Sequence, residues 1–182
     1  MASLMPPVSE RDHVRGNPRA PATLLEFGDY ECPYCGAAHP IVRRVHQRMG
    51  DRMRFVFRHF PLAQVHPHAR TAAEAAEAAG AQGMFWEMHD TLYEHQHALD
   101  DLHLIEYATE IGLDVARFQL ELASHAHAAR VREDYLSALR SGANATPTFF
   151  INGRRHDGSY DEQALILALE AAVEGYSVAG AP

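Results

Sequence analysis

The sequence is short of cysteine: its 182 residues contain only two, Cys32 and Cys35. Structural zinc normally takes four ligands, and no second cysteine pair is present to complete such a site. A disulfide between residues so close together would constrain the unfolded chain little, because the entropic gain grows with loop length. We therefore expect a redox-active dithiol, with an incidental pair or a metal site as the alternatives.

Long apolar runs and an excess of positive charge are also missing. No stretch approaches the roughly 18 apolar residues that a membrane-spanning helix needs. The 16 Lys and Arg are outnumbered by 24 Asp and Glu, for a net charge of −8, which argues against a nucleic acid partner because phosphate binding needs a basic face. Residues 1–12 lack the apolar core of a secretory signal, so a cytoplasmic location is expected, with no membrane partner.

The residues around the two cysteines predict a strand followed by a helix. Residues 23–27 form a short apolar run, and residues 36–49 have a helical pattern. Pro33 suits the first turn of that helix, where its missing N–H would have no partner anyway. Unpaired N–H groups at a helix start stabilise a thiolate and lower its pKa. Cys32 is expected at the exposed tip, with Cys35 one turn deeper and able to close a disulfide with it.

Helices are predicted to interrupt the strands. Residues 53–60 are rich in aromatic and branched side chains typical of a strand, and a short edge strand is predicted within residues 8–14. Between residues 62 and 141 the sequence predicts only helices, at about 69–81, 84–96, 100–112, 114–122 and 126–140. A strand follows over residues 146–151, then the hairpin signal Asn152-Gly153, a return strand at 154–156 and a helix capped by Asp161.

This order of elements resembles the thioredoxin superfamily, and within it the DsbA-like thiol–disulfide oxidoreductases, which carry a helical domain inserted into the thioredoxin fold. The resemblance rests on residues 26–35, Glu-Phe-Gly-Asp-Tyr-Glu-Cys-Pro-Tyr-Cys, and on residues 146–153, Thr-Pro-Thr-Phe-Phe-Ile-Asn-Gly. It implies an α/β fold with a central mixed sheet flanked by helices. Residues 8–62 and 142–176 would form its N-terminal and C-terminal parts, and residues 63–141 the all-helical insertion.

The resemblance also implies roles for residues beside the catalytic Cys32 and Cys35. Pro147 matches the family's cis-proline, which presents the backbone of the preceding residue, here Thr146, to a substrate peptide. The dipeptide between the cysteines, Pro33-Tyr34, is likewise expected to contact substrate.

Glu26 matches a buried acid of the family that manages protons near the inner thiol. A carboxylate within an apolar strand is costly unless it has a partner or accepts a proton. Arg58, on the neighbouring predicted strand, could be that partner. The alternative is a carboxylate that points into solvent from a sheet edge.

The 13 histidines raise the question of a metal site. Three pairs are spaced two apart, which does not place side chains on one helix face. We therefore expect solvated or core histidines and no metal. The pairs are His66 and His68, His95 and His97, and His125 and His127.

These features predict an enzyme that acts by dithiol–disulfide exchange and needs no cofactor beyond its own disulfide. Oxidising members of the family carry histidine where this chain has Tyr34, so a cytoplasmic reductase or isomerase is expected. Its substrates would be protein or small-molecule disulfides and thiols, and glutathione or a thioredoxin-type system would recycle it. The alternatives are a non-catalytic redox-sensing or interaction domain, or a glutathione-dependent transferase or isomerase, whose members generally lack a second cysteine.

Overall fold

The computed structural model describes residues 3–179, which divide into two compact units. The first, here the sheet unit, comprises residues up to 27, residues 37–58 and residues from 137 onward. The second, the helical unit, comprises residues 28–36 and 59–136. The chain therefore crosses between the units four times: on either side of residues 28–36, which carry the cysteines, between residues 58 and 59, and between residues 136 and 137.

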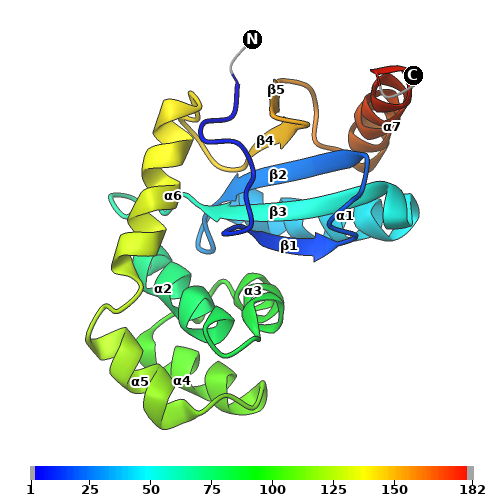
Figure 1. Ribbon diagram of the computed structural model, residues 1–182. Coiled ribbons are helices and arrows are strands. Elements are labelled where there is room, and N and C mark those ends of the chain that lie inside the picture. Colours follow the sequence, from blue (N-terminus) through cyan, green and yellow to red (C-terminus); the bar gives the residue numbers. More distant parts are fainter. Residues whose placement is uncertain (1–2, 180–182) are drawn as a thin grey trace. The chain divides into compact units, whose positions relative to one another are not determined.

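The sheet is mixed and has the order β1-β3-β2-β4-β5 (Figure 1). Its strands are β1 (His13–Gly16), β2 (Ala22–Gly28), β3 (Met53–His59), β4 (Thr148–Ile151) and β5 (Arg154–His156). The β1–β3, β2–β4 and β4–β5 pairs are antiparallel. Every residue of the central strand β2 is buried, as its apolar sequence predicts. The thioredoxin-like fold is thus confirmed, although the first strand begins at residue 13 rather than 8.

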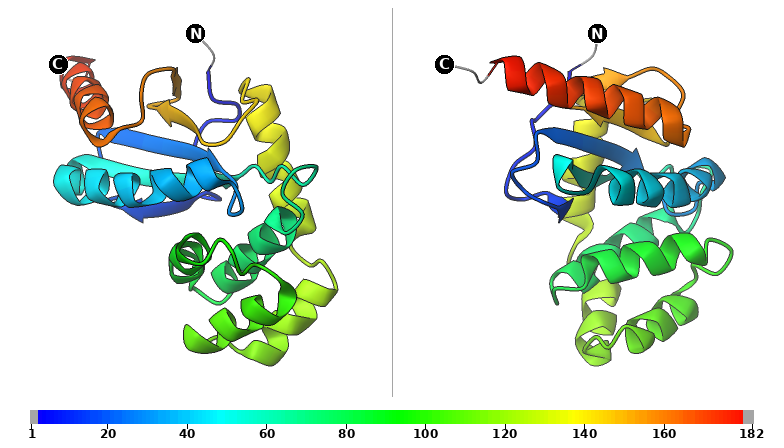
Figure 2. Two further views of the ribbon diagram at one scale, coloured as in Figure 1. Left: turned by 180° about the vertical axis from the view of Figure 1, so that it is seen from behind. Right: turned by 90° about the vertical axis from the view of Figure 1, so that its right-hand side faces the viewer.

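Local signals in the sequence account for the C-terminal elements of the sheet unit. Asn152 and Gly153 both have positive φ, 45° and 76°, as a tight hairpin between twisted strands requires. Asp161 accepts a hydrogen bond from the Ala164 N–H at 2.9 Å and so caps α7 (Glu162–Ala179). Helix α7 packs against β4, and the body of α1 (Pro33–Met49) lies against one face of the sheet (Figure 2).

The helical insertion lies between β3 and β4 in the chain. It consists of α2 (Ala69–Gly80), α3 (Phe85–Glu94), α4 (Asp101–Glu110), α5 (Val115–Ala123) and α6 (Ala128–Arg140). Asp100 and Asp114 cap α4 and α5 by accepting backbone N–H bonds. The alanine-rich α2 is largely buried and contacts α3, α4 and α5, because small side chains let neighbouring helices approach closely. Among residues 3–179, no helix is long and apolar enough to cross a membrane.

Candidate functional site

Two carboxylates shape the loop that leads from β2 to the cysteines. Asp29 is buried, and its carboxylate accepts hydrogen bonds from the N–H groups of Glu31 and Leu62, at 2.9 and 2.8 Å. The ring of His66 lies 2.8 Å from the same carboxylate. Glu31 binds the backbone N–H and the ring of His68, at 2.7 and 2.9 Å. The segment before Cys32 is therefore tied by both acids to the loop of residues 62–68.

The two cysteines lie at the start of α1, as predicted. Pro33 is the first residue of the helix, and the Gly36 N–H donates to the Cys32 carbonyl at 3.1 Å. The expectation that Cys32 is exposed is wrong: it is 3% exposed and Cys35 is 0% exposed. The backbone of Cys32 is bonded on both sides, since its N–H also donates to the Asp29 carbonyl, and this holds the residue inward. Tyr34 is the exposed member of the motif, at 66%.

A residue that the sequence did not single out completes this loop. The side-chain amide of Gln96, in the turn after α3, donates to the carbonyl oxygens of Tyr30 and Cys32, each at 2.8 Å. A glutamine in a turn carries no sequence signal of such a role. The nearest available hint was Gly36, a glycine directly after the second cysteine, which can mark a close approach of another chain segment.

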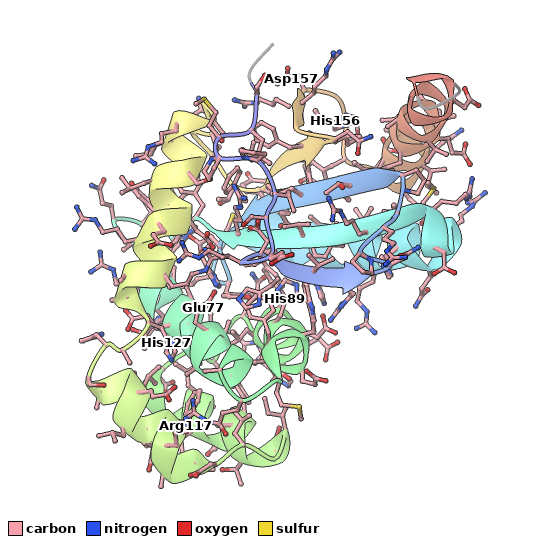
Figure 3. All side chains as sticks on the ribbon, in the orientation of Figure 1. Glu77, His89, Arg117, His127, His156 and Asp157 are labelled. Atoms are coloured by element: carbon pink, nitrogen blue, oxygen red, sulfur yellow. The ribbon has the colours of Figure 1, made fainter. Side chains whose placement is uncertain are left out.

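Tyr30, two residues before Cys32, anchors the loop in the core of the helical unit. It is 1% exposed, and its hydroxyl lies 3.0 Å from Nδ1 of the equally buried His89 (labelled in Figure 3). Its ring also packs on those of His59 and Tyr93, with centroids 5.9 and 4.9 Å away. The loop that carries the cysteines therefore has little freedom to move within its unit.

Glu26 lies in the middle of β2 and is 2% exposed, which rules out a carboxylate that points into solvent from an edge. The predicted pairing with Arg58 is wrong. All five N–H donors of Arg58 bind other groups, namely the Asp12 carboxylate, the Ser137 hydroxyl and the carbonyls of Pro6 and Pro7. The sequence could not reveal this, because Asp12 lies in an irregular segment before β1.

The Thr146–Pro147 peptide bond is cis, as the resemblance implies. Both residues directly precede β4, and Thr146 is buried. In the sheet, β4 pairs with β2, where Glu26 lies opposite Phe149. The sheet unit thus brings Glu26 and the Thr146–Pro147 turn onto neighbouring strands, whereas Cys32, Pro33, Tyr34 and Cys35 share one helical turn in the helical unit.

One buried cluster in the helical unit has the residue types of a metal site. Ligand atoms of His59, Glu77 and Asp134 lie within 4.8 Å of one another (Glu77 is labelled in Figure 3). His59 Nε2 lies 2.9 Å from Glu77, and the His59 N–H donates to Asp134 at 3.1 Å. Arg130 lies 3.1 Å from Asp134 and 3.8 Å from Glu77. Because Arg130 already supplies positive charge to both acids, an ion-pair network accounts for the cluster. Burial raises the pKa of Asp134.

In two of the three histidine pairs, the two rings bind different acids. His66 binds Asp29 and His68 binds Glu31, while His125 binds Glu74 and His127 binds Glu121. Each of these rings has a different acid as its partner, so the members of a pair do not converge on one point.

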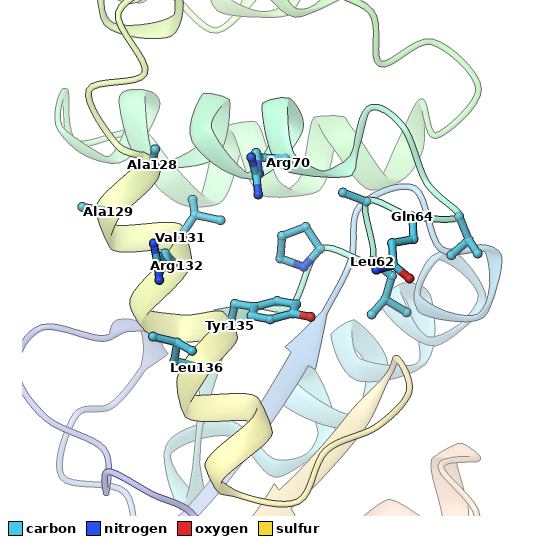
Figure 4. A pocket seen from close by; sticks show the side chains of 12 residues that line it. Leu62, Gln64, Arg70, Ala128, Ala129, Val131, Arg132, Tyr135 and Leu136 are labelled. Carbon is cyan, nitrogen blue, oxygen red and sulfur yellow. The ribbon is translucent and has the colours of Figure 1, made fainter.

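A cavity of about 830 Å³ lies within the helical unit, between the loop after β3 and α6 (Figure 4). Its walls are mainly apolar, with Leu62, Val65 and Val131 among them, and Arg70 and Arg132 also line it. The loop that forms one wall is the same loop that Asp29 and Glu31 hold.

The thioredoxin-like sheet, the helices inserted between β3 and β4, and the two cysteines at the start of α1 define a DsbA-like thiol–disulfide oxidoreductase. A family model described as thioredoxin matches residues 8–171, and the chain belongs to this family. Similar solved structures include BdbD from Bacillus subtilis, with 24% identity, a TM-score of 0.84 and coverage of 96% of this chain and 99% of that one. A thioredoxin-like oxidoreductase from Silicibacter pomeroyi has 28% identity, a TM-score of 0.81 and coverage of 91% and 94%.

Curated relatives are longer proteins named as ion antiporters. The Na(+)/H(+) antiporter NhaA 1 of Salinispora arenicola is 52% identical over 173 residues, which are 94% of this chain and 26% of that protein. The Na(+)/H(+) antiporter NhaA of Herminiimonas arsenicoxydans is 49% identical over 173 residues, 94% of this chain and 27% of that protein. The chain therefore spans about a quarter of the length of the curated relatives it matches.

Proposed function

We propose that the protein exchanges dithiols and disulfides with its substrates through Cys32 as the attacking thiol and Cys35 as the resolving thiol. The observation that carries this assignment is the position of both cysteines in one turn at the start of α1. The small exposure that remains belongs to Cys32, at 3% against 0% for Cys35. The unpaired N–H groups of the helix start favour a thiolate at that end.

The reaction balances without a cofactor. The Cys32 thiolate attacks one sulfur of a substrate disulfide, a mixed disulfide forms and the other substrate sulfur leaves as a thiolate. The Cys35 thiolate then attacks the Cys32 sulfur and releases the second substrate thiolate. The substrate gains two electrons and two protons, and the protein becomes the Cys32–Cys35 disulfide. A reductant such as glutathione or a thioredoxin-type protein would return it to the dithiol.

Pro33, Tyr34, Thr146 and Pro147 are proposed to contact substrate. Tyr34 supports this because it is a large aromatic side chain left 66% exposed beside the cysteines. Glu26 is proposed to handle the proton of the inner thiol, since it is a buried carboxylate. The Glu26→Gln variant should slow the decay of the mixed disulfide more than its formation. Equal rates for variant and wild type from pH 6 to pH 9 would reject that role.

Tyr34 supports the proposed direction, which is reduction or isomerisation. A strong oxidant owes its strength to an unusually stable thiolate in the reduced form, and a neutral tyrosine adds no charge to stabilise it. Equilibration in glutathione buffers, with free thiols counted, tests this. A reduction potential near the values of about −200 to −270 mV of glutaredoxins and thioredoxin is expected. A potential above about −150 mV would place the protein with the oxidants, near the value of about −120 mV of DsbA.

The proposed location is the cytoplasm, and an ion antiporter is a candidate partner. The antiporter is suggested by the relatives named as Na(+)/H(+) antiporters, of which this chain covers about a quarter. Expression of the Cys35→Ser variant in the source cells should leave partners disulfide-linked to Cys32, where mass spectrometry can identify them. Capture of cytoplasmic proteins would support the location, and capture of an antiporter cysteine would support the partner. Capture of exported proteins alone would reject both.

Catalysis separates this proposal from a redox-sensing domain on the same fold. Insulin reduction by dithiothreitol or glutathione should be faster with the protein than without it. Titration of the two thiols without turnover of insulin or of a small disulfide would favour the sensor instead.

A further inference from the structure

The side chain of Gln96 is directed entirely at the loop that carries Cys32. Its amide nitrogen lies 2.8 Å from the Tyr30 carbonyl and 2.8 Å from the Cys32 carbonyl. A primary amide has two N–H donors, so both are used on this loop. The two carbonyls are two residues apart, and the amide therefore closes a clamp across the turn that precedes α1.

The Gln96 amide also lies directly against Gly36, on the first turn of α1. A Cβ added to Gly36 would overlap the Gln96 amide, with Oε1 as its nearest atom. Gly36 is not among the residues with positive φ, so its backbone does not require glycine. Alanine would favour the helix. A side chain at position 36 would therefore require the Gln96 amide to move away from its present place.

We infer that Gln96 is a positioning residue for the thiol chemistry: it fixes the Cys32 backbone so that the sulfur stays at the helix start. The inference rests on the proposed function, because it concerns the reactivity of Cys32. The Cys32 carbonyl also accepts the Gly36 N–H at 3.1 Å, the bond that opens the helix. Gln96 therefore acts on the carbonyl that joins the loop to the helix, and its amide hydrogens add partial positive charge there.

The direction of the effect follows from this arrangement. Without the amide, the loop is less firmly held and the Cys32 thiolate loses part of its stabilisation. The Cys32 pKa should then rise, and its alkylation at neutral pH should slow. At equilibrium with glutathione, a larger fraction of the protein should be in the disulfide form. The loss of one hydrogen bond of ordinary strength should change these equilibrium constants by about three- to tenfold.

The test uses Gln96→Leu, which keeps most of the volume and removes both donors. The exposed Gln47→Leu variant on α1 is the matched control. Iodoacetamide alkylation of Cys32 is followed from pH 5 to pH 9 in a Cys35→Ser background, and the glutathione equilibrium is measured with both cysteines present. For Gln96→Leu we expect an alkylation midpoint at higher pH and an equilibrium shifted about three- to tenfold toward the disulfide. An unchanged pH profile in a folded variant, even with lower stability, would reduce Gln96 to a packing role and overturn the inference.

Gly36→Ala gives an independent check. In the wild-type background it should reproduce the Gln96→Leu defect, because the new methyl displaces the amide. When combined with Gln96→Ala, it should add no further defect. If Gly36→Ala changes the alkylation profile and the glutathione equilibrium equally in the wild type and in Gln96→Ala, its effect does not act through Gln96. If the wild-type protein fails to exchange with glutathione at all, the proposed function fails, but the alkylation profile still decides the role of Gln96.

Discussion

Arg58 and His59 are consecutive residues of β3 that lie in different units, and each is the centre of a buried polar network. In the sheet unit, all five N–H donors of Arg58 are bonded, and the Asp12 carboxylate supplies the opposite charge at 2.6 Å. In the helical unit, His59 meets Glu77 and Asp134, and the adjacent Arg130 lies 3.1 Å from Asp134. The first network is built around a guanidinium, and the second around a histidine and two carboxyl groups.

The two networks also differ in how they respond to pH. A guanidinium group is always charged in proteins, and both carboxylate oxygens of Asp12 accept hydrogen bonds from Arg58. The His59 network contains a histidine and two carboxyls, and burial raises the pKa of Asp134. The comparison indicates that a buried network can fix a structure when its charges are permanent and its donors are all bonded. A network of titratable groups makes stability depend on pH instead.

The largest expected effect is the loss of Arg58. The Arg58→Met variant leaves Asp12 buried without its guanidinium, and removal of one partner of such a pair typically costs about 3–5 kcal/mol. Urea unfolding at pH 7 measures the loss. Arg52→Met is the matched control, because the Arg52–Glu170 pair is exposed and about 0.5 kcal/mol or less is expected. A loss below about 1 kcal/mol for Arg58→Met would show that the Arg58 network is not a source of stability.

Asp134→Asn should lower the free energy of unfolding by less, about 1–2 kcal/mol at pH 7. The amide oxygen can still accept the His59 N–H, and the ionised carboxyl that burial disfavours is gone. Because the folded-state pKa of Asp134 lies above the unfolded value, its contribution is fully present below the unfolded value and is lost as pH rises through the folded one. The stability of wild type relative to Asp134→Asn should therefore increase toward acid pH. A difference that stays constant from pH 7 to pH 4 would contradict the raised pKa.

The smallest expected effect tests whether the sheet unit is free of pH dependence. Partial burial, with Arg15 nearby, lowers the pKa of His46 on α1. Its contribution to stability is present above the unfolded value of about 6.5 and is lost as pH falls through the lowered folded value. Wild type should lose slightly more stability between pH 7.5 and pH 5 than His46→Gln does, in urea unfolding at each pH. If the stability of wild type and of His46→Gln changes equally with pH, His46 does not contribute to the pH dependence.

Much of the fold could be predicted because its signals are local. The apolar run of β2, the Asn152-Gly153 turn and the capping residues Asp100, Asp114 and Asp161 each act on residues close in sequence. The predicted helices of the insertion agree with α2 to α6 to within a few residues. The cysteines at the start of α1 follow from the same local reasoning.

What sequence reasoning missed depends on residues far apart in the chain. The partner of Arg58 is 46 residues away in an irregular segment, and the carbonyl that Gln96 clamps at Cys32 is 64 residues away. No periodicity or spacing connects such pairs. The burial of Cys32 was missed for the same reason, since the bonds that hold its backbone inward include one from the turn after α3.

The contact between Gly36 and Gln96 has a consequence for the evolution of the family. Because a Cβ at position 36 would occupy the space of the Gln96 amide, a side chain at position 36 would move that amide away from the Cys32 carbonyl. Relatives with a larger residue at the position of Gly36 should carry a shorter one at the position of Gln96, and the two positions should covary. Drift of one without the other would alter the reactivity of the thiol while both cysteines remain in place.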